Sequence, residues 1–220
     1  MVNQNYLYKF FNSKVYNNHE VICMLKSILY PLGCVFIPVI IYMLCYFKKN
    51  NKNHFRWSLI FVLYLFLVIM VTGIGSIFDI YDFKTMQFIS IDHTFVLIPF
   101  KSGINMSSIL NIIMFMPFGF LLPMIFTDYK QLNKVIILSI ATTVLIETMQ
   151  LFTGRICDVE DIIMNVSGAI IGFFLWKNIG INIFKEDFKR SMMLSINEPT
   201  VYVLLSFISS FLLYNWKFSL

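Results

Sequence analysis

The feature that most constrains the fold of this chain is a succession of apolar runs, each long enough to cross a lipid bilayer. A helix rises 1.5 Å per residue, so roughly 20 residues span a hydrocarbon core of about 30 Å. We expect membrane-spanning helices at residues 27–47, 57–78, 109–127, 134–153, 162–183 and 200–216. The last run is short and the third contains Pro117 and Pro123, so five to six spans are expected. The sequence therefore predicts an all-α fold, a polytopic transmembrane helical bundle.

The composition agrees with this class of protein. Hydrophobic residues make up 58% of the chain and charged residues only 13%, which is typical of an integral membrane protein. The net charge of +5 does not indicate nucleic-acid binding, because the basic residues flank apolar runs instead of lining a stripe among aromatics. We expect a multi-pass protein of the cell membrane whose partners include membrane lipids and no nucleic acid.

The distribution of Lys and Arg predicts the orientation. The loops at 48–56 and 177–199 each contain four of these residues, so both should be cytoplasmic. The loops at 79–108 and 153–161 are then external, and the external side carries most of the acids. The N-terminus would also be external, although Lys9, Lys14 and Lys26 oppose this orientation. No cleavable signal peptide is visible, so the first span is expected to act as its own insertion signal.

A helical stripe of polar and small residues begins at the predicted outer end of the fifth span. Asp158, Asp161, Asn165, Gly168 and Gly172 follow one another at steps of three, four, three and four, which places them on one helix face. The two glycines form a GxxxG pattern, which favours the close approach of a neighbouring helix. The stripe therefore joins an acidic outer end to a surface suited to helix packing.

The preceding span contributes a second set of polar groups at the same depth. Glu147 and Gln150 share a face, and Glu147 lies about 7 to 8 Å below the outer interface, where an unpaired carboxylate is costly. Arg155, the nearest cation in the sequence, is placed to bridge carboxylates of both helices. Asn111 lies at the corresponding depth of the third span. We expect Glu147 to form one polar site with Arg155 and the acids that begin the stripe.

Simpler structural roles compete with this interpretation. Asp158, Glu160 and Asp161 are also what the dipole favours at a helix N-terminus, and Asn165 suits a hydrogen bond between helices. Glu160 lies off the stripe, so its replacement by Gln should be tolerated. Glu147 is the hardest to explain this way, because an ionisable residue inside a span is a functional candidate by default.

The sequence lacks the minimum parts of several common enzymes. It contains no HExxH, P-loop, GxSxG or GxGxxG motif, which excludes zincin, nucleotide-binding and standard serine-hydrolase sites. No cofactor or metal site is predicted; a divalent cation, if bound, would be Mg²⁺, Ca²⁺ or Mn²⁺, because the available ligands are oxygens. Whether the protein catalyses a reaction is left open.

Four ordered segments resemble the successive motifs of VanZ-like membrane proteins. They are VLIPFKS at 96–102, NIIMFMPFGFLLP at 111–123, IETMQLF at 146–152 and RICDVEDIIMNVSGAIIG at 155–172. The resemblance covers about half of the chain and implies a helical membrane domain at 57–184. Residues 1–56 would then form an N-terminal tail, a first transmembrane helix and a basic cytoplasmic loop, and residues 185–220 a cytoplasmic loop and a C-terminal transmembrane helix.

The resemblance also selects positions for a site. The candidate catalytic residues are Glu147, Asp158 and Asp161. The candidate ligand-binding residues are Asn111, Gln150, Arg155 and Asn165. The candidate structural residues are Pro99, Phe100, Pro117, Gly119, Gly168 and Gly172.

The founding member of the family is associated with resistance to lipid-tailed glycopeptides such as teicoplanin. The resemblance implies a protein at the outer face of the bacterial cytoplasmic membrane that binds or acts on a cell-envelope lipid, a lipid-linked cell-wall precursor or a glycopeptide. The alternative is a transporter or accessory subunit whose acids relay protons or cations. A relay needs ionisable groups along its whole path, and the sequence has no acid between Asp128 and Glu147. We therefore favour the first interpretation.

Overall fold

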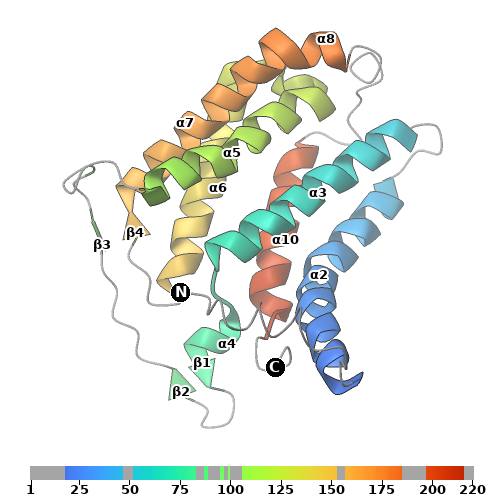
Figure 1. Ribbon diagram of the computed structural model, residues 1–220, viewed down its shortest axis with the longest axis vertical. Helices are drawn as coiled ribbons and strands as arrows, with labels where there is room; N and C mark the ends of the chain where they lie inside the picture. The colour runs from blue at the N-terminus through green and yellow to red at the C-terminus, as the bar shows by residue number, and fades with distance from the viewer. Residues whose placement is uncertain are drawn as a thin grey trace, which may run out of the picture.

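The computed structural model describes residues 18–46, 52–82, 87–88, 95–96, 99, 106–152, 157–184 and 197–215. Its main elements are six helices (Figure 1): α2 (Asn18–Tyr46), α3 (Lys52–Thr72), α5 (Met106–Ile125), α6 (Leu132–Leu151), α7 (Val159–Leu175) and α10 (Glu198–Leu213). A π-helical turn, η2 (Trp176–Gly180), and α8 (Ile181–Ile183) continue α7 without a break. The remaining short elements are α4 (Ile77–Ile80), the 3₁₀ turn η1 (Thr127–Lys130), β1 (Tyr81–Asp82), β2 (Gln87–Phe88), β3 (Phe95–Val96) and β4 (Cys157–Asp158).

The predicted membrane architecture is confirmed. Five helical stretches are long and apolar enough to cross a bilayer: Leu25–Cys45, Lys52–Ile80, Met106–Ile125, Leu132–Leu151 and Val159–Ile183. Pro117 and Pro123 lie inside α5 without ending it. The expected sixth span corresponds to α10, which is apolar but has only 16 residues and ends at Leu213. The chain is therefore a multi-pass, all-helical membrane protein.

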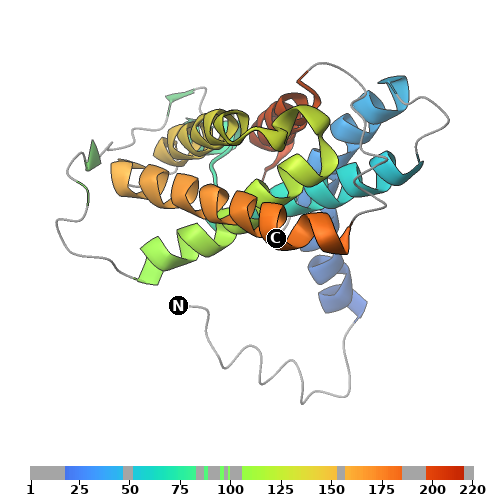
Figure 2. The same ribbon diagram turned by 90° about the horizontal axis from the view of Figure 1, so that it is seen from above.

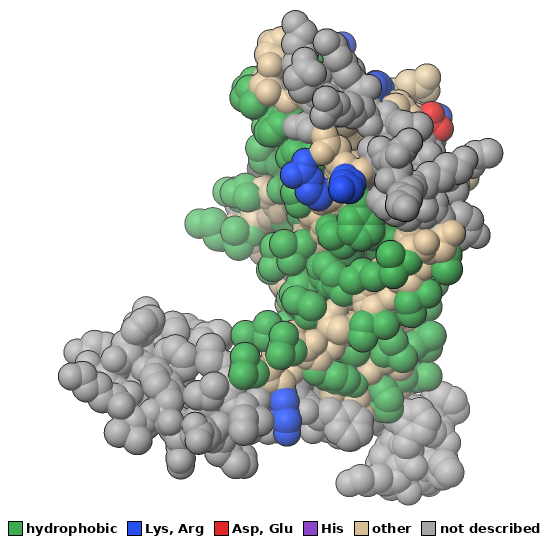
Figure 3. Space-filling model, turned by 90° about the vertical axis from the view of Figure 1, so that its right-hand side faces the viewer, with side chains coloured by type: hydrophobic (Ala, Val, Ile, Leu, Met, Phe, Trp, Pro, Cys, Tyr) green, Lys and Arg blue, Asp and Glu red, His purple; other side chains and the backbone are tan. Residues whose placement is uncertain are grey.

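Apolar side chains cover the outside of the bundle as well as its interior. Ile37 of α2, Val71 of α3 and Ile137 of α6 are all largely exposed, as expected of residues that face lipid. Figure 3 shows one face, where apolar side chains form a broad band with basic side chains above and below it. The interior is aromatic: the ring of Phe61 lies 5.9 Å from that of Phe118 and 5.6 Å from that of Phe126.

The helices alternate in direction, so the bundle has two distinct ends. We call one the Glu147 end, where the ends of α3 and α6 meet through a hydrogen bond from Gly75 N to Met149 O. We call the other the His54 end, where Trp57 at the start of α3 packs edge to face against Phe184 after α8, at 5.7 Å between ring centroids. The loops predicted to be cytoplasmic both lead from the His54 end, and those predicted to be external lead from the Glu147 end. Which end faces the cytoplasm stays a prediction.

Helices α5 and α7 pack backbone against backbone, and they run alongside each other in Figures 1 and 2. A Cβ atom built on Gly168 would lie 2.2 Å from the Ile112 carbonyl oxygen, and one on Gly172 would lie 1.9 Å from that of Met116. On the other helix, a Cβ on Gly119 would lie 1.8 Å from the Ala169 carbonyl oxygen. The predicted close approach at the GxxxG pattern is confirmed, and its partner is α5.

A short sheet ties the long loop after α4 to the start of α7. β3 pairs in parallel with β4, with Phe95 opposite Cys157 and Val96 opposite Asp158. The first two residues of the apolar run at 95–100 therefore pair with the segment that begins the acidic stripe. β1 and β2 form a separate antiparallel pair.

Candidate functional site

Glu147 lies in the last turns of α6, and its side chain is only 3% exposed. Its Oε2 atom accepts a hydrogen bond of 3.1 Å from the backbone N–H of Asp158, at the junction of β4 and α7. The short connection between the two helices therefore brings the start of α7 back beside Glu147, as the sequence predicted. The Cys157 side chain also hydrogen-bonds to this carboxylate. Neither of these described partners carries a positive charge, which leaves a carboxylate buried in an apolar span without charge compensation from them.

Asp158 has a structural role at the same point. Its Oδ1 accepts a 2.8 Å hydrogen bond from Glu160 N, which makes it the N-cap of α7. The carboxylate of Asp158 therefore has the simpler role of capping a helix, and the backbone N–H of the same residue donates to Glu147. Asp158 positions the beginning of the stripe.

The next two acids both contact α5. Asn111 Nδ2 donates to Asp161 Oδ1 at 2.5 Å. Ser108 Oγ donates to Glu160 Oε1, and Glu160 is 6% exposed. Glu160 was placed off the stripe, but α5 comes so close at the glycines that it also contacts the side of the first turn of α7 that carries Glu160. The tolerance of Glu160→Gln stays a prediction.

Two amides also join neighbouring helices, Asn165 deeper in the bundle and Gln150 near the end of α6. Asn165 Nδ2 donates to Thr143 Oγ1 of α6 at 2.7 Å, and Gln150 Nε2 donates to the Thr72 carbonyl oxygen at 2.9 Å. The bond to Thr143 is the hydrogen bond between helices that the simpler interpretation of Asn165 predicted. Its Oδ1 atom, however, is buried and has no hydrogen-bond partner in the described part of the chain. A buried acceptor in this state is available to a donor from water or a ligand.

The site is rich in acceptors and lacks a described cation. Among the described residues the ion pairs are His54 with Glu198 and Lys134 with Asp128, both away from Glu147. Arg155 and Phe100 lie outside the described residues, and for Pro99 the structure gives only a partly buried turn position. Within the same residues, no three His, Cys, Asp or Glu side chains are placed to share a metal ion.

Such a set of groups suits a ligand that offers several hydrogen-bond donors. Carboxylate oxygens accept from hydroxyl, amide or ammonium groups, and a carboxyl group can also exchange a proton with a bound hydroxyl. The candidate residues that the structure brings together come from three helices: Asn111 from α5, Glu147 from α6, and Asp161 and Asn165 from α7.

Cys157 provides a local probe of this site. Burial, and next the neighbouring Glu147 carboxylate, raise the pKa of the Cys157 thiol. The thiolate is the reactive form, so a lower pKa at fixed pH means faster alkylation. We expect Glu147→Gln to accelerate labelling of Cys157 by an impermeant maleimide in intact cells, in a background with Ala at Cys23, Cys34 and Cys45.

Asp128→Asn, which removes an exposed carboxylate at the His54 end, is the matched control and should leave the rate unchanged. An equal labelling rate in the wild-type and Glu147→Gln backgrounds would contradict the proximity. Labelling of Cys157 only after the cells are permeabilised would contradict the predicted orientation.

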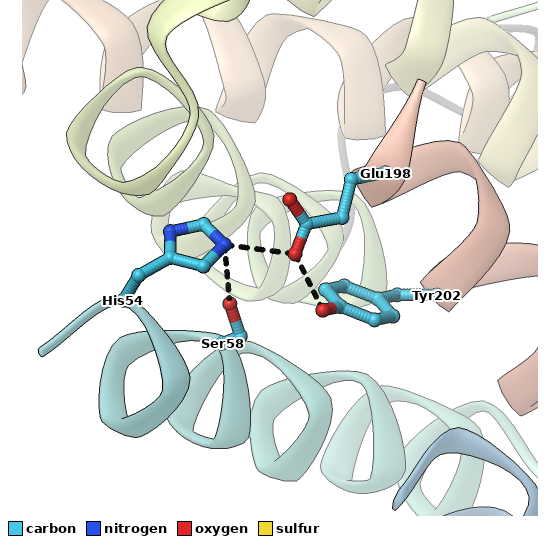
Figure 4. A network of polar contacts seen from close by, with 4 residues as sticks. All are labelled: His54, Ser58, Glu198 and Tyr202. Atoms are coloured by element: carbon cyan, nitrogen blue, oxygen red, sulfur yellow. Dashed lines mark hydrogen bonds and ion pairs between the residues drawn. The ribbon is translucent and has the colours of Figure 1, made fainter. Parts of the chain in front are cut away.

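A second buried polar cluster, which no sequence pattern indicated, lies at the His54 end (Figure 4). His54 Nε2 lies 2.8 Å from Glu198 Oε1 and 3.4 Å from Ser58 Oγ, and Tyr202 OH donates to the same Glu198 oxygen at 2.5 Å. All four side chains are buried. His54 and Glu198 are 144 positions apart, so no local spacing could have paired them.

This cluster does not have the geometry of a hydrolase triad. In a triad the Ser and the acid contact opposite ring nitrogens of the His. Here both contact Nε2, and the group has no exposure through which a substrate could reach it. We interpret it as a connection between α3 and α10.

The comparison with known families identifies the central part of the chain. Residues 61–184 match the VanZ/LLP1 family, which is more than half of the sequence. The match contains every residue of the candidate site at the Glu147 end. It leaves out α2, α10 and all four residues of the His54 cluster. A search of curated proteins and a search of solved structures both gave no significant match.

Proposed function

The chain belongs to the VanZ/LLP1 family, and from that premise we propose that it binds or acts on a lipid or lipid-linked glycan of the bacterial cell envelope, using the Glu147 end. The observation that carries the proposal is Glu147 itself. It is a carboxylate held in an apolar span and only 3% exposed, and the described residues that hydrogen-bond to it, Asp158 through its backbone N–H and Cys157 through its side chain, supply no positive charge. A buried acid of this kind is costly to the fold and is usually kept for a function.

The surroundings of Glu147 support a polyhydroxylated or amide-bearing head group. Asp161 and Asn111 lie against each other on α7 and α5, and Asn165 offers a buried carbonyl oxygen. These are acceptors at the depth where the head group of a lipid meets the hydrocarbon region. A lipid-linked cell-wall precursor or a lipid-tailed glycopeptide combines such a head group with an apolar chain.

The predicted orientation supports an external site. The Lys and Arg of the 48–56 and 177–199 loops favour a cytoplasmic His54 end, which leaves the Glu147 end outside. Lipid-linked precursors are assembled into the wall on that side, and teicoplanin approaches from it. We therefore propose a role in protection from lipid-tailed glycopeptides.

The test uses a host that is sensitive to teicoplanin. We expect the wild-type chain to raise the teicoplanin concentration that stops growth and Glu147→Gln to abolish that protection, because it keeps the size of the side chain and removes its charge and its basicity. Asp128→Asn should protect like the wild type. A Glu147→Gln protein as protective as wild type at matched membrane levels would refute the site, and a wild type without protection would refute the resistance role.

The alternative is a transporter or accessory subunit in which the acids relay protons or cations. The buried His54–Glu198 pair at the opposite end favours it, because it adds ionisable groups on the other side of the bundle. Between the two ends, however, the buried polar side chains of the described residues are hydroxyls and amides such as Ser139, Thr142 and Asn165. We favour the lipid-handling function, since a relay needs ionisable groups along its path.

A further inference from the structure

A cavity of about 110 Å³ lies between α2, α3 and α10. Six apolar side chains form most of its wall: Pro31 and Val35 of α2, Phe66, Ile69 and Met70 of α3, and Ile74 just after α3. Ser210 and Tyr214 complete it from the α10 side. None of these residues belongs to the acidic site at the Glu147 end.

The cavity is suited to hydrocarbon and poorly suited to water. A buried water needs two to four polar partners, and an apolar cavity of roughly this size stays dry and accepts apolar molecules. An empty cavity also costs stability, because its wall loses dispersion contacts. An apolar occupant would restore them.

The surface next to the cavity identifies the source of that occupant. Met70 lines the cavity and is also 45% exposed on the outside of α3. Its neighbours Leu67 and Val71 are still more exposed, so this side of α3 belongs to the lipid-facing surface. The cavity is continuous with a surface that acyl chains cover in a membrane.

The walls of the cavity are fixed in place at both ends of α10. At the Glu147 end, Tyr30 OH of α2 donates to the Leu213 carbonyl oxygen at 2.6 Å and accepts from Asn215 N at 3.2 Å. At the other end, the His54–Glu198 contact fastens α10 to α3 (Figure 4). A preformed site of this kind binds without the cost of ordering its walls.

Two of the three walls lie outside the part of the chain that matches the family. Helix α2 precedes residue 61 and α10 follows residue 184, and the cavity lies where these two helices meet α3. We propose that this cavity binds one alkyl chain of a bilayer lipid, with α2 and α10 as the two walls that lie outside the matched family domain. The inference is independent of the function proposed for Glu147.

The experiment uses the full chain in nanodiscs of phosphatidylethanolamine and phosphatidylglycerol. A small fraction of the phosphatidylglycerol carries a diazirine on its acyl chain, and cross-linked residues are mapped by mass spectrometry after irradiation. We expect cross-links at Val35 and Ile74, which are almost fully buried, to be at least as frequent as at Ile137, which faces lipid from α6. Absence of cross-links at both cavity residues would overturn the proposal.

Filling the cavity gives the specific control. Ile69→Phe adds volume inside the cavity and should reduce cross-linking at Val35 and Ile74 several-fold, whereas Leu67→Phe, on the lipid-facing side of the same helix, should not. Ser210→Leu fills the same space from α10 and serves if Ile69→Phe fails to fold. Unchanged cross-linking in the filled variants would refute an alkyl chain in the cavity. Glu147→Gln should leave the cross-links intact, so failure of the proposed function and failure of this site are distinguishable.

Discussion

Replacing His54 by Leu is expected to destabilise the folded protein by about 3–5 kcal/mol, because the substitution leaves the Glu198 carboxylate buried without its partner. Tyr202 would remain as a donor to that carboxylate, but its hydroxyl alone does not replace the contact that His54 Nε2 makes with the same oxygen. The measurement is the thermal unfolding midpoint in detergent, read by size-exclusion chromatography of a fluorescent fusion. A large fall in that midpoint is the expected result.

Two further variants make this result interpretable. The double variant with Leu at both His54 and Glu198 removes the charge as well as the partner, so it should be clearly more stable than the single variant. Lys134→Leu breaks the ion pair with Asp128, in which both side chains are about half exposed, and should change stability by less than about 1 kcal/mol. Equal unfolding midpoints for the single and double variants would contradict the role of the buried pair.

Gly168→Leu is expected to cause the second large loss of stability. Even a methyl group at this position would lie 2.2 Å from the carbonyl oxygen of Ile112, and backbone cannot move aside as a side chain can. Overpacking usually costs about 1–3 kcal/mol, and separation of α5 from α7 along their shared face places this case at the upper end or beyond. The yield of folded protein in detergent and its thermal midpoint should both fall.

Ile170→Leu is the matched control, since it lies two residues away on the same helix and keeps the side-chain volume. Gly168→Ala should be intermediate between the two. Equal thermal stability of Gly168→Leu and Ile170→Leu would remove the close-packing interpretation of the GxxxG pattern. The Gly168→Leu variant should also weaken the Asn111–Asp161 hydrogen bond, because those residues lie on the same pair of helices.

Helical periodicity and the length of the apolar runs were sufficient to predict the spans and part of the site. The spacing from Asp158 to Gly172 predicted a packed stripe, and the short connection after α6 predicted the meeting of Glu147 with the start of α7. Both predictions depend on contacts that are close in sequence or fixed by one helix. For this reason they could be made without knowing the arrangement of the other helices.

The contacts that sequence reasoning missed are those between distant segments. Glu160 lies one position before Asp161 and was placed off the stripe, yet α5 contacts both residues. The pairing of Phe95 with Cys157 joins a loop to a helix start, and two-residue strands have no periodic pattern to reveal them. His54 lies in a basic loop region, where a surface role is the natural expectation, and only the arrangement in space buries it.

The contact between His54 and Glu198 has a consequence for biosynthesis. During translation the start of α3 leaves the ribosome long before α10, and the two residues are 144 positions apart. Until α10 is made, His54 lacks the carboxylate that it contacts in the complete bundle. We therefore expect the contact between α10 and α3 to form late in the assembly of the bundle, after the other helices described here have been synthesised.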